Sequence, residues 1–190
     1  MRWLILYARS RQVPTSVAAV TLVALVLWAL NLGRPGPVDL GLVVVVLTAN
    51  VAAASVGLGG RDPALERTAA IRWVPRRAAH VLLIGAFASA ALLAVRAAGV
   101  ELAPTEVVVR DGAGLVGLAA LGAALCGAQF AWTLPTGWLA FTLLVPTPRG
   151  TVGEVLHWMS FPPGTAASAA TAWALLATGT VAYALAGPRR

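Results

Sequence analysis

Long apolar stretches, separated by short polar or glycine- and proline-rich connections, follow one another along the 190-residue chain. Five of them approach the roughly 20 residues that a helix needs to cross a bilayer. Turn clusters such as Gly33-Arg34-Pro35-Gly36-Pro37 and Gly187-Pro188 end two of them. We therefore expect one all-α, polytopic transmembrane domain, residues 1–190. Its predicted spans are residues 13–32, 40–59, 81–98, 113–132, 133–146 and 166–186.

The stretch at 133–146 leaves two interpretations open. Its uninterrupted apolar part, Gly137 to Val145, stops at Pro146 and is too short to cross a bilayer alone. It crosses as a proline-kinked helix that starts near Gln129, or it forms a re-entrant hairpin. The first interpretation gives six spans and the second gives five.

Composition narrows the class of protein. Hydrophobic residues make up 59% of the chain and charged residues 11%, against roughly 45–50% and about 25% in soluble domains. These values exclude an ordinary soluble domain, a disordered chain and a coiled coil. All 14 basic residues are arginine, which is typical of a GC-rich bacterial genome.

The formal charge of +7 indicates orientation in a membrane. With six spans and both termini in the cytoplasm, ten arginines lie inside and four outside, as the positive-inside rule describes. We expect an N-in/C-in protein of the bacterial cell membrane that contacts lipid and no nucleic acid. The inside set is Arg2, Arg9, Arg11, Arg61, Arg67, Arg72, Arg76, Arg77, Arg189 and Arg190; the outside set is Arg34, Arg96, Arg110 and Arg149.

Three segments outside the spans have patterns of their own. Residues 1–12 mix aromatic and basic residues, which suits a short interfacial helix or a simple basic anchor. Asp62-Pro63 is a helix start, and a helix at 63–72 would grip a partner or the membrane surface; a solvated basic loop is the alternative. Residues 147–165 are too apolar for a solvated loop and predict a re-entrant segment at the outer interface.

The inventory of reactive side chains excludes an enzyme. His80 and His157 fall on opposite sides of the predicted membrane, Cys126 is the single cysteine, and all carboxylates fall in connections or at span ends. The sequence contains no phosphate-binding loop and no Gly-x-Ser-x-Gly motif. We expect no catalytic residue, metal or cofactor in this chain.

Within the spans, polar and small residues indicate helix packing. Asn50 and Gln129 are costly in lipid, so we expect each to face another helix or a pathway. Small residues recur at every fourth position in two spans, which favours a tight bundle or a dimer interface. These stripes are Ala86, Ala90, Ala94 and Ala98, and Ala166, Ala170, Ala174, Thr178 and Ala182.

The layout resembles the membrane (permease) subunits of type-2 ATP-binding-cassette (ABC) exporters, in particular small permease-like subunits of actinobacteria. The residues that carry the resemblance are Asp62-Pro63-Ala64-Leu65-Glu66-Arg67 with Arg72, Arg76 and Arg77, and Leu156-His157-Trp158-Met159-Ser160-Phe161-Pro162-Pro163. The resemblance implies two permeases, as a homo- or heterodimer, above two cytoplasmic ATPase subunits that bind ATP and Mg²⁺.

The resemblance also assigns roles to residues. Asp62, Glu66, Arg67, Arg72, Arg76 and Arg77 would form the ATPase-coupling interface. The re-entrant segment, with Glu154, His157, Trp158 and Pro162, would seal the external side of the pathway. The first hypothesis is therefore a non-catalytic exporter subunit that moves an apolar or amphipathic substrate. The alternative is a membrane scaffold or accessory subunit of a larger complex, with no transport activity.

Overall fold

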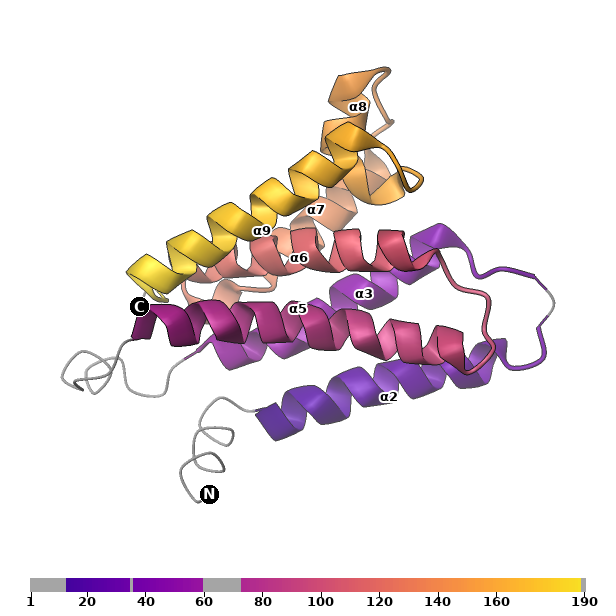
Figure 1. Ribbon diagram of the computed structural model, residues 1–190, viewed down its shortest axis with the longest axis horizontal. Helices are drawn as coiled ribbons and strands as arrows, with labels where there is room; N and C mark the ends of the chain where they lie inside the picture. The colour runs from indigo at the N-terminus through magenta and orange to yellow at the C-terminus, as the bar shows by residue number, and fades with distance from the viewer. Residues whose placement is uncertain (1–12, 35, 60–72, 189–190) are drawn as a thin grey trace.

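The computed structural model describes residues 13–34, 36–59 and 73–188, and every regular element in these ranges is helical (Figure 1). The predicted interfacial segment at 1–12 and the predicted helix at 63–72 lie outside the described residues. The elements are α2 (Val13–Asn31), α3 (Leu40–Ser55), η1 (Val56–Leu58), α5 (Trp73–Ala97), α6 (Thr105–Leu125), η2 (Ala128–Phe130), α7 (Thr133–Leu144), α8 (Thr151–Leu156), η3 (Trp158–Ser160) and α9 (Ala166–Ala186).

Five helices are long and apolar enough to cross a membrane: α2, α3 continued by η1, α5, α6 and α9. The helix in the sixth predicted stretch, α7, has 12 residues. At 1.5 Å per residue such a helix covers about 18 Å, less than the roughly 30 Å of a hydrocarbon core. The architecture of the described residues is thus compatible with a multi-pass membrane protein with five long helices.

Helix α6 lies at the centre of the bundle, in contact with α3, α5, α7 and α9. Nearly all of it is buried, whereas most of α2 and α9 is exposed. Its glycines explain this position, because they let neighbouring backbones approach closely. A Cβ at Gly117 would overlap the carbonyl oxygen of Leu175 in α9, and one at Gly179 would lie 2.8 Å from the carbonyl carbon of Gly117.

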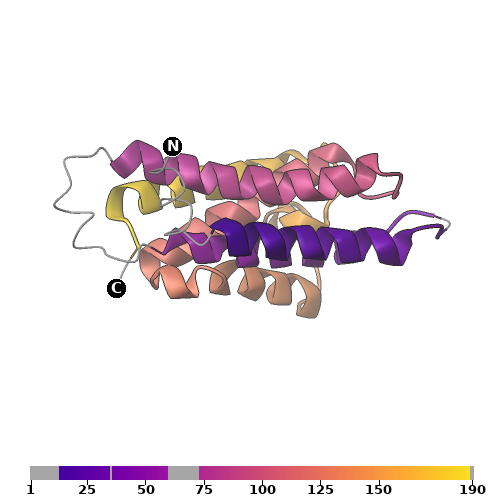
Figure 2. The same ribbon diagram turned by 90° about the horizontal axis from the view of Figure 1, so that it is seen from below.

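The helices α6 and α9, which make the most extensive contact in the bundle, run parallel to each other. Arg110, near the start of α6, bonds to residues just before α9, and Gly117 meets α9 near Gly179. The chain between them must therefore return along the bundle, and α7 covers part of that distance (Figure 1). In contrast, α2, α3, α5 and α6 alternate in direction (Figures 1 and 2).

Hydrogen bonds between distant connections close both ends of the bundle. At the end where α5 begins and α9 ends, which we call the Arg77 end, Tyr183 Oη donates to the carbonyl of Leu58 at 2.6 Å, and Arg77 Nη1 donates to that of Ala184 at 3.5 Å. At the other end, which we call the α8 end, the N–H of Val38 donates to the carbonyl of Glu101 at 2.8 Å. These contacts join connections that are distant in sequence.

Observed helix ends agree with the sequence pattern at the turns after α2 and α9, and differ at both ends of α6, which stops at Leu125 although the predicted span continues to Trp132. α2 ends at Asn31, before the glycine- and proline-rich turn, and α9 ends before Gly187. α6 begins at Thr105, directly after Pro104, and ends at Leu125. The predicted span at 113–132 begins later because it treats Arg110 and Asp111 as part of a connection; the structure places both inside the helix.

Candidate functional site

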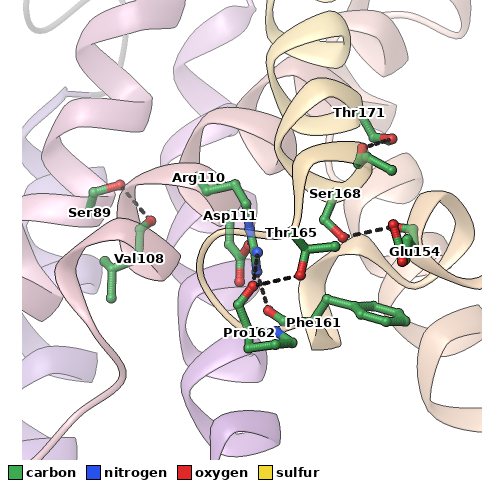
Figure 3. A network of polar contacts seen from close by, with 11 residues as sticks. Ser89, Val108, Arg110, Asp111, Glu154, Phe161, Pro162, Thr165, Ser168 and Thr171 are labelled. Carbon is green, nitrogen blue, oxygen red and sulfur yellow. Dashed lines mark hydrogen bonds and ion pairs between the residues drawn. The ribbon is translucent and has the colours of Figure 1, made fainter. Parts of the chain in front are cut away.

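A buried pair of opposite charges lies in the first half of α6. Arg110 Nε donates to Asp111 Oδ1 at 2.8 Å, and the two residues are only 6% and 1% exposed. Adjacent residues in a helix point in different directions, but the long arginine side chain reaches back to the neighbouring carboxylate (Figure 3). This corrects the expectation that every carboxylate falls in a connection or at a span end, since Asp111 stands within a helix long enough to cross a membrane.

The Arg110 guanidinium also ties α6 to the chain that leads into α9. Its Nη2 donates to the carbonyl of Phe161 at 2.9 Å and its Nη1 to that of Pro162 at 3.2 Å. Thr165 Oγ1 donates to the same Pro162 carbonyl at 3.1 Å (Figure 3). All three guanidinium nitrogens therefore have acceptors, which is the arrangement that makes a buried charge tolerable.

Residues 147–165, which we call the α8 segment, pack into the bundle beside this pair. Trp158 and Met159 are fully buried, and the Trp158 ring lies against α6 at Gly114, where a Cβ would stand 2.8 Å from Trp158 Cζ3. Trp138 Nε1 of α7 donates to the carbonyl of Leu156 at 3.0 Å. Ser168 Oγ of α9 donates to the carbonyl of Glu154 at 2.9 Å. Three helices thus hold one segment.

The residues predicted for this segment lie together at the α8 end. Glu154 is partly buried, and its backbone carbonyl, rather than its carboxylate, makes the contact with Ser168. His157 is fully buried beside the Phe141 ring, with the ring centroids 5.3 Å apart. Neither of its ring nitrogens has a hydrogen-bond partner within the described residues. Pro162 is exposed and contributes the carbonyl that Arg110 binds.

The two polar residues predicted to face a helix or a pathway have different surroundings. Asn50 of α3 is fully buried, and its amide has no hydrogen-bond partner among the described residues. Gln129 is exposed in η2, in the connection between α6 and α7. The expectation for Gln129 is therefore corrected: because α6 ends at Leu125, its side chain falls beyond the helix.

The basic cluster predicted to bind an ATPase is only partly described. Asp62, Glu66, Arg67 and Arg72 lie outside the described residues. Arg76 and Arg77 stand in the first turn of α5 and are partly buried, at the Arg77 end. They lie at the opposite end of α9 from the α8 segment, since Arg77 contacts Ala184 whereas Glu154 contacts Ser168. The structure therefore keeps the two predicted regions apart.

The described residues offer no arrangement suited to a metal. His80 Nε2 donates to the carbonyl of Gly57, at the Arg77 end, whereas His157 lies at the α8 end. No group of three or more histidine, cysteine, aspartate or glutamate side chains converges in the described ranges. The site consequently consists of a paired charge, backbone carbonyls and apolar rings.

Apolar grooves run along the outside of the bundle. The groove between α2 and α5 has a volume of about 500 Å³ and is lined by Trp28, Phe87, Ala90, Ala94 and their neighbours, with no charged side chain. The alanine stripes behave differently from the tightly packed glycines of α6. Four residues of each stripe are exposed: Ala86, Ala90, Ala94 and Ala98 on α5, and Ala166, Ala170, Ala174 and Thr178 on α9.

No protein-family model matches the sequence, and the comparisons with curated proteins and with solved structures give no match either.

Proposed function

We propose that this chain is a non-catalytic permease subunit of an ABC-type exporter in a bacterial cell membrane, coupled to a separate ATPase. The observation that carries the proposal is the separation of two regions along the bundle. Arg76 and Arg77 lie at one end of α9, and the apolar α8 segment packs between helices at the other. An exporter subunit needs two different ends, one that binds the ATPase and one that closes the external side of the substrate pathway.

The proposal includes six crossings, with both termini in the cytoplasm. Because α6 and α9 are parallel, residues 126–165 must return from one end of the bundle to the other. The helix α7 and the extended residues that follow it supply this return. The sequence holds ten of its 14 arginines in residues 1–12, 61–77 and 189–190, which supports a cytoplasmic position for these parts of the chain.

The substrate and partners follow from the exposed faces. The groove between α2 and α5 is lined by apolar side chains, which favours an apolar or amphipathic substrate. The exposed small residues on α9 provide a flat surface on which a second permease can pack closely. ATP and Mg²⁺ would be bound by the ATPase subunits.

Charge reversal at the Arg77 end tests the coupling. In the variant Arg72→Glu/Arg76→Glu, we expect association with the ATPase to fall by at least about tenfold, because like charges replace complementary ones at the interface. Arg77 is left unchanged since it bonds to Ala184. The measurement is the amount of ATPase that co-purifies with the tagged chain.

The matched control is Arg34→Glu/Arg149→Glu, which reverses two exposed arginines of the connections at the α8 end. It should leave ATPase association unchanged. Size-exclusion chromatography confirms that both variants remain folded. Equal ATPase recovery from the two double variants would overturn the coupling assignment, and a stable complex without any ATPase would favour the scaffold function.

A further inference from the structure

We propose that Arg110 is a positioning residue that latches the α8 segment onto α6, and that the segment swings away as a unit, on Gly150 and Gly164, when the latch opens. The inference starts from the Arg110 guanidinium, which binds a carboxylate of its own helix and two backbone carbonyls of the α8 segment. The inference concerns the conformations of this chain alone and does not depend on the proposed function.

The α8 segment has a hinge at each end of its helical part. Gly150 has φ +71° and Gly164 has φ +86°, a left-handed conformation that favours glycine. No neighbouring atom lies within 4 Å of the position that a Cβ would take at either residue. Glycine also has the widest choice of dihedral angles, so these two residues are the points about which the segment would turn. Between them, α8 and η3 form a short helical body.

Among the described residues, Arg110 makes two of the four side-chain hydrogen bonds that join the α8 segment to α6, α7 and α9. Trp138 and Ser168 each donate one hydrogen bond to a carbonyl of the segment. Arg110 donates two, both charge-assisted and both close to the Gly164 hinge. The Trp158 indole nitrogen has no hydrogen-bond partner within the described residues, so packing alone holds its ring at Gly114.

Asp111 makes release of the segment feasible. The bond from Arg110 Nε to Asp111 Oδ1 lies entirely within α6, so it persists when the carbonyls of Phe161 and Pro162 move away. The arginine charge stays neutralised in both positions, and water can replace the two carbonyls. The backbone contact between Gly117 and Gly179 involves neither Arg110 nor the segment. Opening of the latch thus leaves the packing of α6 against α9 in place.

Cysteine accessibility tests the latch in the full-length, detergent-solubilised protein. In a Cys126→Ser background, which removes the exposed native thiol, one reporter is Met159→Cys in η3 and a second is Val81→Cys in α5; both positions are fully buried. Each reporter is combined with Arg110→Gln, Arg110→Lys and the control Arg149→Gln, at an exposed arginine. The probe is a water-soluble maleimide.

We expect Arg110→Gln to speed labelling of the Met159→Cys reporter by at least about tenfold, because a neutral amide cannot replace two charge-assisted bonds. Arg110→Lys should give an intermediate rate, since lysine keeps the charge but lacks the planar fork. Arg149→Gln should have no effect. The Val81→Cys reporter should stay unreactive throughout, because Val81 lies one turn from Arg77, at the opposite end of the bundle from the α8 segment.

Hydrogen exchange provides a second measurement without reporter cysteines. The amides of His157 and Ser160, bonded to the carbonyls of Gly153 and His157, should exchange faster in Arg110→Gln, whereas the α6 amides should not. Unchanged protection of the segment in both measurements would overturn the proposal. Parallel loss of protection at Val81 and in α6 would also overturn it, because Arg110 would then support the whole fold.

Discussion

Replacing Gly179 by alanine is expected to destabilise the protein severely, and replacing it by leucine to abolish the folded bundle. A Cβ at this position would stand 2.8 Å from the carbonyl carbon of Gly117 and closer still to its oxygen. Those are backbone atoms of the central helix, so they cannot move aside as a side chain would. Overpacking of a core costs about 1–3 kcal/mol when side chains can adjust, and here the two helices themselves must separate.

The measurement is thermal unfolding in detergent, with size-exclusion chromatography to detect aggregation. Gly137 provides the matched control, because it is exposed in α7 and a Cβ there meets nothing within 4 Å. Gly137→Ala should be neutral or slightly stabilising, since alanine favours a helix over glycine. A Gly179→Ala variant as stable as Gly137→Ala would refute the close packing of α6 against α9.

Trp158→Ala is the second substitution with a large expected effect. The Trp158 side chain is fully buried between helices, and truncation of a buried tryptophan costs about 3–5 kcal/mol because a cavity remains. Trp173→Ala is the control, because it is the same substitution at a tryptophan that is 49% exposed on α9. The free energy of unfolding, measured by denaturant titration in detergent, should fall sharply only for Trp158→Ala.

A substitution at Gly114 tests the same contact between Trp158 and α6 from the other side. The three atoms nearest to a Cβ at Gly114 would all belong to the Trp158 ring. Gly114→Ala should therefore destabilise the protein when Trp158 is present and cost little in the Trp158→Ala background, where the added methyl fills vacated space. A double-mutant cycle measures this coupling. Strictly additive effects would contradict the packing of Trp158 on α6.

The sequence predicts well those helix ends that backbone chemistry determines. The glycine- and proline-rich turns after α2 and α9 end these helices where the pattern predicts, whereas Pro135 and Gly137 lie inside α7. The start of α6 could not be found from hydropathy, because Arg110 and Asp111 each count as polar although together they are neutral. Pro104 at the helix start is the signal that could have located it.

The surroundings of the site were less predictable than its residues. Glu154, His157, Trp158 and Pro162 all belong to the segment that packs on α6 and α9, but Arg110 and Asp111, which anchor it, were assigned to a connection. The alanine stripes on α5 and α9 follow a regular spacing, yet the backbones meet at Gly117 and Gly179 instead. Spacing identifies a face of a helix, whereas only tertiary structure selects its partner.

Purification of the tagged chain from its native membranes, with identification and quantification of every co-purifying protein, tests the proposed transport role most directly. An ATP-hydrolysing subunit should be recovered in an amount comparable to that of the chain, and the complex should hydrolyse ATP. A stable complex with other membrane proteins, recovered under the same conditions without any ATPase, would contradict a role in ABC-type export.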